Sequence, residues 1–167
     1  MSKKLIVLFL LSCLFSLGQT KSNSKSETYT SRKGLYQIKY TPDHWIKNSK
    51  SENWDAEFND KYNLVTVYFI EYDYFISDKK LKSTIEEEYK EFGKIKNLKI
   101  YKKKLQNIEV TYFTCELDYN DYLYKYQGFF YSGKGGSIQM QYGGQAEAIE
   151  QNQNLIDELN NGISILN

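Results

Sequence analysis

Four apolar-rich segments separated by very short links occupy the second half of the chain, and this pattern limits the possible folds more than any other feature. The segments cover residues 98–104, 108–119, 122–133 and 136–144. The links contain Gln-Asn, Asn-Asp and Gly-Lys-Gly-Gly, which are residues that favour tight turns. Strands joined by so few residues must run antiparallel. The sequence therefore predicts an antiparallel sheet built from consecutive hairpins.

Three earlier segments also have the patterns of strands. Residues 35–40 and 54–58 alternate between two faces, as expected for strands with one buried side. Residues 63–75 are β-branched and apolar on both faces in the middle. Such a strand is typical of a sheet that is covered on both sides. The sheet is therefore expected to hold about six to seven strands.

Two segments change to a helical period. In the first, Ser77 or Asp78 can cap the start and Gly93 lies where a helix would end. Its apolar stripe consists of Leu81, Ile85, Tyr89 and Phe92. The second covers residues 145–167, with a stripe of Ile149, Ile156, Leu159, Ile163 and Leu166, and Gly162 can end it early. The pattern predicts one α+β domain over residues 34–167, with an antiparallel sheet flanked by two main helices.

The amino terminus has the pattern of a signal peptide over residues 1–18. Two lysines precede an apolar run at residues 5–17, which is too short to span a bilayer. Small residues favour cleavage after Gly18, while lipidation of Cys13 is the alternative. Residues 19–33 are polar and predict a flexible arm. The protein is expected to be periplasmic or secreted, or a membrane lipoprotein, with no transmembrane span in its mature form.

The charge of the mature chain gives no sign of a nucleic-acid partner. Removal of residues 1–18 leaves 20 basic and 21 acidic residues. Cys115 is the only cysteine certain to remain, so no intramolecular disulfide is possible. Because it lies in a strand pattern, we expect an inert, buried thiol.

The residues that carry chemistry in other proteins are poorly represented. His44 is the only histidine, which argues against a zinc site or a nucleophile activated by imidazole. The stretch "ELDYND" fails as a calcium loop, because Tyr122 and Leu123 interrupt its ligand positions. The stretch "GFFYSGKG" lacks both the hydroxyl and the following helix of a phosphate-binding loop. No catalytic, cofactor-binding or metal-binding residue is predicted.

The stretch "YTPDHW" predicts a structural corner. Pro42 lacks an N–H group and biases Thr41 toward extended geometry, so strand pairing should stop there. Asp43 can hydrogen-bond nearby backbone in the turn. Trp45 is large enough to cover an edge of the sheet and anchor the following loop. His44 is expected to have a structural role.

The order of these signals resembles the PsbP-like superfamily, which includes DcrB-type bacterial extracytoplasmic proteins. The resemblance rests on "YQIKYTPDHW", on the strand and helix in "VTVYFIEYDYFISDKKLKSTIEEEYKEF", and on "IEVTYFTCELDY" with the hairpin and helix that follow. It implies an αβα sandwich around an antiparallel sheet. It also implies an accessory or binding module without common catalytic residues.

Together these features predict a non-enzymatic extracytoplasmic domain that docks on an unknown envelope protein or complex. The candidate contacts are Tyr122, Tyr124 and Tyr126, which share one face of a strand. The alternative is a cone-shaped α+β domain of the NTF2-like or cystatin-like type, with a ligand pocket or a hydrolase or isomerase site. A deep apolar pocket containing His44 or paired carboxylates would favour this alternative.

Overall fold

The four turn-linked segments form three consecutive hairpins. The computed structural model describes residues 25–49, 52–90 and 92–166. The hairpin strands are β6 (Ile95–Leu105), β7 (Ile108–Tyr119), β8 (Tyr122–Gly133) and β9 (Gly136–Gln145). Each link is two residues long, and both residues of the β7–β8 turn, Asn120 and Asp121, have positive φ. This is the geometry of the turns that match strand twist, so the predicted hairpins are confirmed.

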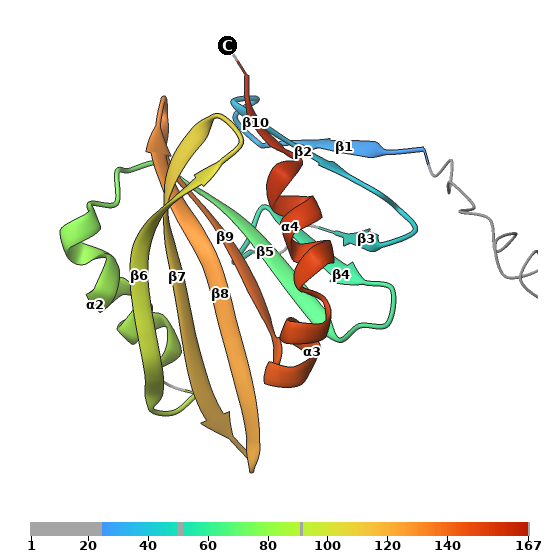
Figure 1. The fold of residues 1–167 in the computed structure, drawn as a ribbon. Helices are drawn as coiled ribbons and strands as arrows, with labels where there is room; N and C mark the ends of the chain where they lie inside the picture. Colours follow the sequence, from blue (N-terminus) through green and yellow to red (C-terminus); the bar gives the residue numbers. More distant parts are fainter. Residues whose placement is uncertain (1–24, 50–51, 91, 167) are drawn as a thin grey trace, which may run out of the picture.

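These strands belong to a seven-stranded antiparallel sheet (Figure 1). The other members are β3 (Trp45–Asn48), β4 (Ala56–Asp60) and β5 (Val65–Tyr72). The strand order is β3-β4-β5-β9-β8-β7-β6, so β5 pairs with β9 along its whole length. The α+β class and the antiparallel sheet are as predicted, whereas β3 was not expected from the sequence.

A second, three-stranded sheet has the order β1-β2-β10. It consists of β1 (Glu27–Thr30), β2 (Tyr36–Tyr40) and β10 (Ile163–Ile165). The flexible-arm prediction is therefore wrong for residues 27–30, which pair with β2. Residues 1–18, the predicted signal peptide, lie outside the described residues, as do residues 19–24 of the predicted arm.

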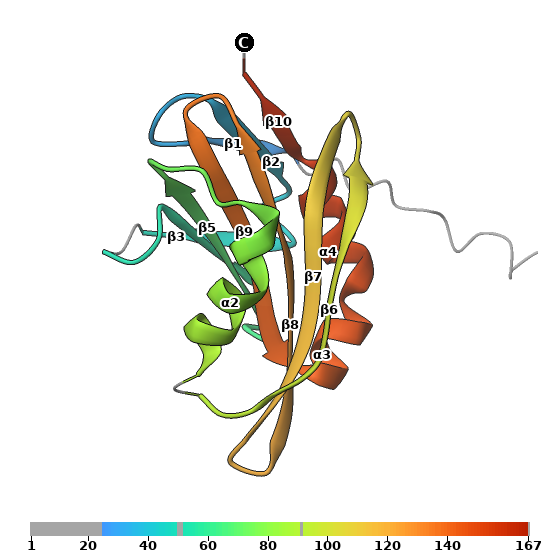
Figure 2. The same cartoon turned by 90° about the vertical axis from the view of Figure 1, so that its left-hand side faces the viewer.

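One face of the large sheet is covered by α2 (Asp78–Tyr89), as Figure 2 shows. Leu81, Ile85 and Tyr89 are buried against a cluster that includes Phe113. Ser77 is the N-cap, but its side chain makes no capping hydrogen bond. The predicted stripe is thus correct except for Phe92, which lies beyond the end of α2 and is 52% exposed.

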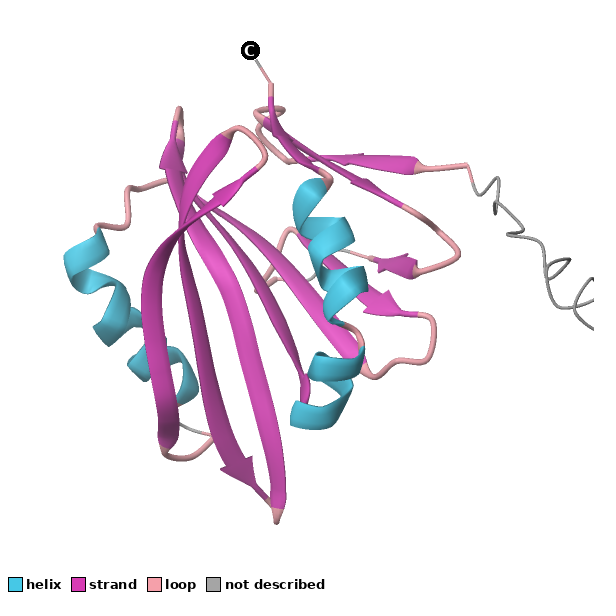
Figure 3. Ribbon diagram, viewed as in Figure 1, coloured by secondary structure: helices cyan, strands magenta, loops and turns pink. Residues whose placement is uncertain are grey.

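The other face is covered by α3 (Ala146–Gln151), α4 (Gln153–Asn161) and the small sheet (Figure 3). The predicted helix is divided at Asn152 and ends at Asn161, where Gly162 is the C-cap, as the sequence allowed. Ile163 and Leu166 of the predicted stripe lie beyond it. A Cβ atom at position 162 would lie 2.0 Å from the carbonyl oxygen of Lys39, so only glycine fits there. The chain continues as β10, which pairs with β2. The result is a layered sandwich with a separate core on each side of the large sheet.

Candidate binding surface

The stretch "YTPDHW" forms the corner between the two sheets. The backbone N–H groups of His44 and Trp45 both donate to the carbonyl of Thr41 at 2.9 Å, which closes the turn after β2. Trp45 begins β3 opposite Asp60 and is 1% exposed in the core. Pro42 lies within the turn, where its missing N–H leaves no strand bond unmade.

His44 has an acidic partner that the sequence did not reveal. Its Nδ1 atom donates to Glu158 Oε2 at 2.9 Å, and Thr41 Oγ1 donates to Glu158 Oε1 at 2.6 Å. The carboxylate on α4 therefore ties the helix to the corner. Because the hydroxyl donates to the carboxylate rather than to the imidazole, the group lacks the nucleophile–base pair of a hydrolase.

Cys115 lies in the core beneath α2 and is 1% exposed. Burial raises the pKa of its thiol to about 12, with smaller contributions from Glu116 and Glu88. The thiol therefore stays protonated at neutral pH, and a protonated thiol is a poor nucleophile. Among the described residues, no three His, Cys, Asp or Glu side chains lie close enough to hold a metal ion.

Three tyrosines of β8 lie on the face of the sheet that α2 partly covers. Tyr122 is 58% exposed, next to the β7–β8 turn. Tyr124 and Tyr126 follow on the same face and are half-buried. All three come from the predicted contact set, but only Tyr124 and Tyr126 line a hollow in the sheet.

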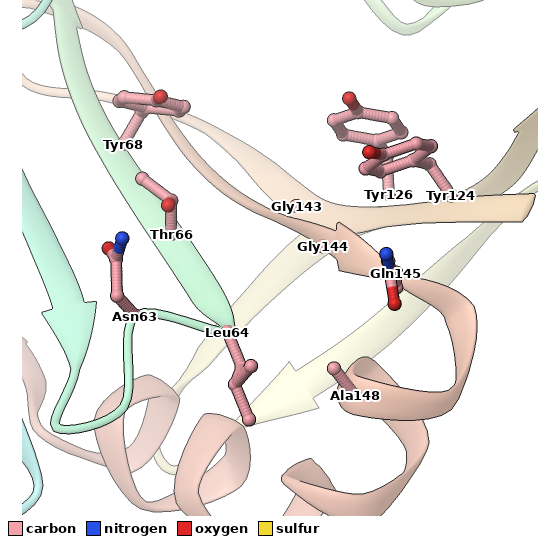
Figure 4. A pocket seen from close by; sticks show the side chains of 10 residues that line it. All are labelled: Asn63, Leu64, Thr66, Tyr68, Tyr124, Tyr126, Gly143, Gly144, Gln145 and Ala148. Atoms are coloured by element: carbon pink, nitrogen blue, oxygen red, sulfur yellow. The ribbon is translucent and has the colours of Figure 1, made fainter. Parts of the chain in front are cut away.

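This hollow, which we call the tyrosine hollow, has a volume of about 410 Å³. Figure 4 shows Tyr68 on one side, Tyr124 and Tyr126 on the other, and Gly143 and Gly144 between them. It lies over the neighbouring strands β5, β9 and β8. The remaining lining residues are Asn63, Leu64, Thr66, Gln145 and Ala148.

The strand register explains why the sheet is hollowed here. Thr66 pairs with Gly143, and Gly143 pairs with Tyr126, so the three residues form one row across β5, β9 and β8. The central position of this row has no side chain. Two strand spacings of about 4.8 Å separate its outer positions, which leaves an opening about 10 Å wide at the backbone. A Cβ atom at Gly143 would meet the Tyr126 ring at 2.7 Å, so glycine is also needed for the position of that ring.

Each aromatic ring of the tyrosine hollow is supported by a second ring. The centroids of Trp54 and Tyr68 are 4.5 Å apart. Tyr89 of α2 packs against Tyr126 with a centroid distance of 4.6 Å. Tyr119 packs edge-on against Tyr124 at 6.4 Å. These contacts fix the rings before any ligand arrives, which reduces the entropy lost on binding.

The polar side chains that line the tyrosine hollow are all uncharged. Within the described part of the chain, the side chains of Thr66, Gln145 and the three lining tyrosines have no protein hydrogen-bond partner. Burial raises the pKa values of Tyr68 and Tyr126, so both hydroxyls are neutral at physiological pH. The lining includes neither His44 nor a carboxylate. The predicted mark of an enzyme-like pocket is therefore missing from this hollow.

Sequence reasoning found Tyr124 and Tyr126 but missed Tyr68, Gly143 and the amide side chains. Tyr68 had a visible signal, because it alternates with the buried residues Val67 and Phe69 and so lies on the half-buried face of β5. The paired glycines Gly143 and Gly144 were interpreted only as the end of a strand. Which tyrosines they separate depends on the pairing of β5 with β9, whose aligned residues are far apart in the chain.

No helix in the described ranges is long and apolar enough to cross a membrane. No known family profile matches the sequence, and no curated protein matches it.

Solved structures do match the chain. An antiparallel sheet held between helices defines the class as α+β sandwiches. Three of the solved structures that are similar to the chain are described next.

Cyanobacterial PsbP (CyanoP) from Synechocystis sp. PCC 6803 aligns with a TM-score of 0.55 and 14% identity, over 90% of this chain and 99% of that one. LpqN of Mycobacterium tuberculosis, described as involved in cell envelope biogenesis, aligns with a TM-score of 0.55 and 12% identity, over 86% and 91%. A Bacteroides thetaiotaomicron protein aligns with a TM-score of 0.55 and 9% identity, over 84% of this chain and 48% of its own. The chain has the PsbP-like fold that its sequence pattern predicted.

Proposed function

We propose that this protein is a non-enzymatic accessory or binding domain that acts outside the cytoplasm by docking on an envelope component. The tyrosine hollow is the observation that carries this proposal. It presents fixed aromatic rings and polar groups without a protein partner, and binding sites commonly contain both. No group in its lining could serve as a nucleophile activated by a neighbouring base.

The extracytoplasmic location rests on the pattern of residues 1–18. Mass spectrometry of the protein purified from cells that export it should find an amino terminus at Gln19. A lipidated Cys13 would instead indicate a membrane lipoprotein, which is still extracytoplasmic. An intact Met1 on all of the protein would contradict export.

A sedimentation assay with isolated bacterial envelopes tests the docking. The wild-type protein should pellet with the envelopes, and Tyr124→Ala should reduce the pelleted fraction several-fold. Tyr74→Ala is the matched control, because Tyr74 is exposed and follows the opposite end of β5. Equal sedimentation of all three proteins would contradict docking through the tyrosine hollow.

A further inference from the structure

The chemistry of the tyrosine hollow also narrows the class of its ligand. We propose that the hollow binds a neutral carbohydrate, such as a segment of an envelope glycan. This inference rests on the proposed function and names the ligand of the same surface. Three observations carry it: the aromatic walls, the uncharged amide and hydroxyl groups, and the position of the hollow within the sheet.

The walls suit the faces of a sugar ring. Tyr68 stands opposite Tyr124 and Tyr126 across a glycine floor, as Figure 4 shows. The face of an aromatic ring carries negative charge density and attracts the polarised C–H groups on the face of a pyranose. The rings of Trp54 and Tyr89 hold two of these walls in place.

The polar side chains of the tyrosine hollow can form hydrogen bonds with the hydroxyl groups of a sugar. Gln145 and Asn63 carry amides, each of which can donate and accept at once, and Thr66 adds a hydroxyl that does both. Neighbouring hydroxyls of a sugar offer the same mixture of donors and acceptors. The Asn63 amide is also hydrogen-bonded to the amide of Asn59, which orients the side chain.

The surroundings make other ligand classes less suitable. No Lys or Arg lines the hollow, so an anionic ligand would have no counter-charge. An extended peptide usually binds to a free strand edge. Here β5, β9 and β8 are each paired on both sides, so their backbone hydrogen bonds are already made. A lipid chain would leave the free hydroxyls and amides unpaired.

Titration of the folded protein with neutral oligosaccharides tests the inference, with binding followed by NMR shifts of backbone amides. The probes are chitohexaose, maltohexaose and cellohexaose, with polygalacturonate as the anionic comparison. At least one neutral probe should shift the amides of Gly143 and Gly144. Tyr124→Ala and Thr66→Val should each weaken that binding about tenfold or more, and Tyr74→Ala should leave it unchanged. Circular dichroism verifies that each variant is folded.

The possible outcomes separate this inference from the proposed function. If no neutral probe binds, or if only polygalacturonate binds, the carbohydrate inference is wrong. If Tyr124→Ala still reduces sedimentation with envelopes, and protease treatment of the envelopes abolishes the wild-type binding, the ligand is a protein and docking stands. If both the probes and the envelopes fail to bind, the proposed function fails as well.

Discussion

Trp45 and His44 are neighbours in the sequence, but only Trp45 belongs to the hydrophobic core. The indole is 1% exposed and packs among the core residues between the large sheet, the small sheet and α4. His44 is about two-fifths exposed, and its contact with Glu158 is an ion pair only when the imidazole is protonated. The two residues of the corner should therefore contribute very differently to stability.

Alanine substitutions at Trp45 and His44 measure how much each side chain contributes to the free energy of unfolding. Trp45→Ala should lower the free energy of unfolding by about 3–5 kcal/mol, because it leaves a large cavity. His44→Ala should lower it by only about 0–1 kcal/mol, as is typical of exposed pairs. Urea unfolding of both variants provides the measurement. A stability loss for His44→Ala as large as that for Trp45→Ala would contradict the weak exposed pair. Loss of envelope binding in His44→Ala would mean that His44 has a functional role.

For single residues, the sequence predicted a role correctly where that role depends on neighbours in the chain. Pro42 limits its own φ and the geometry of Thr41, so the turn could be predicted from adjacent residues. Glu158 lies 114 residues from His44, and no local pattern connects them. Gly143 is a similar case, because its importance comes from the Tyr126 ring on the neighbouring strand.

Strand β1 is held in place by hydrogen bonds at the point where it turns toward β2. Glu71 of β5 is 6% exposed. Its carboxylate accepts from the Ser31 hydroxyl at 3.0 Å and from the backbone N–H of Lys33 at 3.1 Å. Arg32, the only arginine of the chain, pairs with Asp55 at 3.1 Å. These polar contacts connect the small sheet to the large one.

Removal of the Glu71 carboxylate should weaken this connection. Glu71→Ala leaves the Ser31 hydroxyl and the Lys33 N–H group without their acceptor, which should cost about 1–3 kcal/mol. Hydrogen exchange should accelerate at the β1 amides more than at those of β7 and β8. Glu86→Ala is the control, since Glu86 is exposed and pairs with Lys82 on the surface of α2. Equal exchange at β1 in both variants would contradict the role of Glu71.

The elements that could be predicted from sequence are those with local pairing or a full period. The three hairpins were found because each turn lies directly between its strands. Strand β1 was not found, because it carries few apolar residues. Strand β10 was not found, because it pairs with β2 at the other end of the chain. The stripe predicted for the final helix continued beyond Gly162, because Ile163 fits both a helical stripe and the buried side of a short strand.

For the molecule as a whole, the ionisable groups of the core make the fold sensitive to alkali. Burial raises the pKa of the Cys115 thiol to about 12, and it raises those of Tyr29 and Tyr40 to about 12. The corresponding unfolded values are about 8.5 for cysteine and about 10 for tyrosine. At a pH below the pKa values of the unfolded chain, these groups are protonated in both the folded and the unfolded state, and the free energy of unfolding is at its full value. Above them the unfolded state loses its protons first, so the free energy of unfolding must fall.

The free energy of unfolding should therefore be nearly constant from about pH 7 to about pH 8.5 and should decrease between about pH 8.5 and pH 12. Each such group contributes a slope of at most about 1.4 kcal/mol per pH unit. Among these groups, only the cysteine loses its proton in the unfolded state below about pH 9.5. In Cys115→Ala the free energy of unfolding should therefore stay constant up to about pH 9.5, even if the variant is less stable at every pH. Tyr62→Phe, at a side chain that is 74% exposed, serves as the control and should leave the profile unchanged. Urea unfolding across this range, with tyrosine ionisation followed by absorbance, provides the measurement. A wild-type stability that stays constant to about pH 11 would show that the buried thiol and phenols ionise as readily in the folded protein as in the unfolded chain.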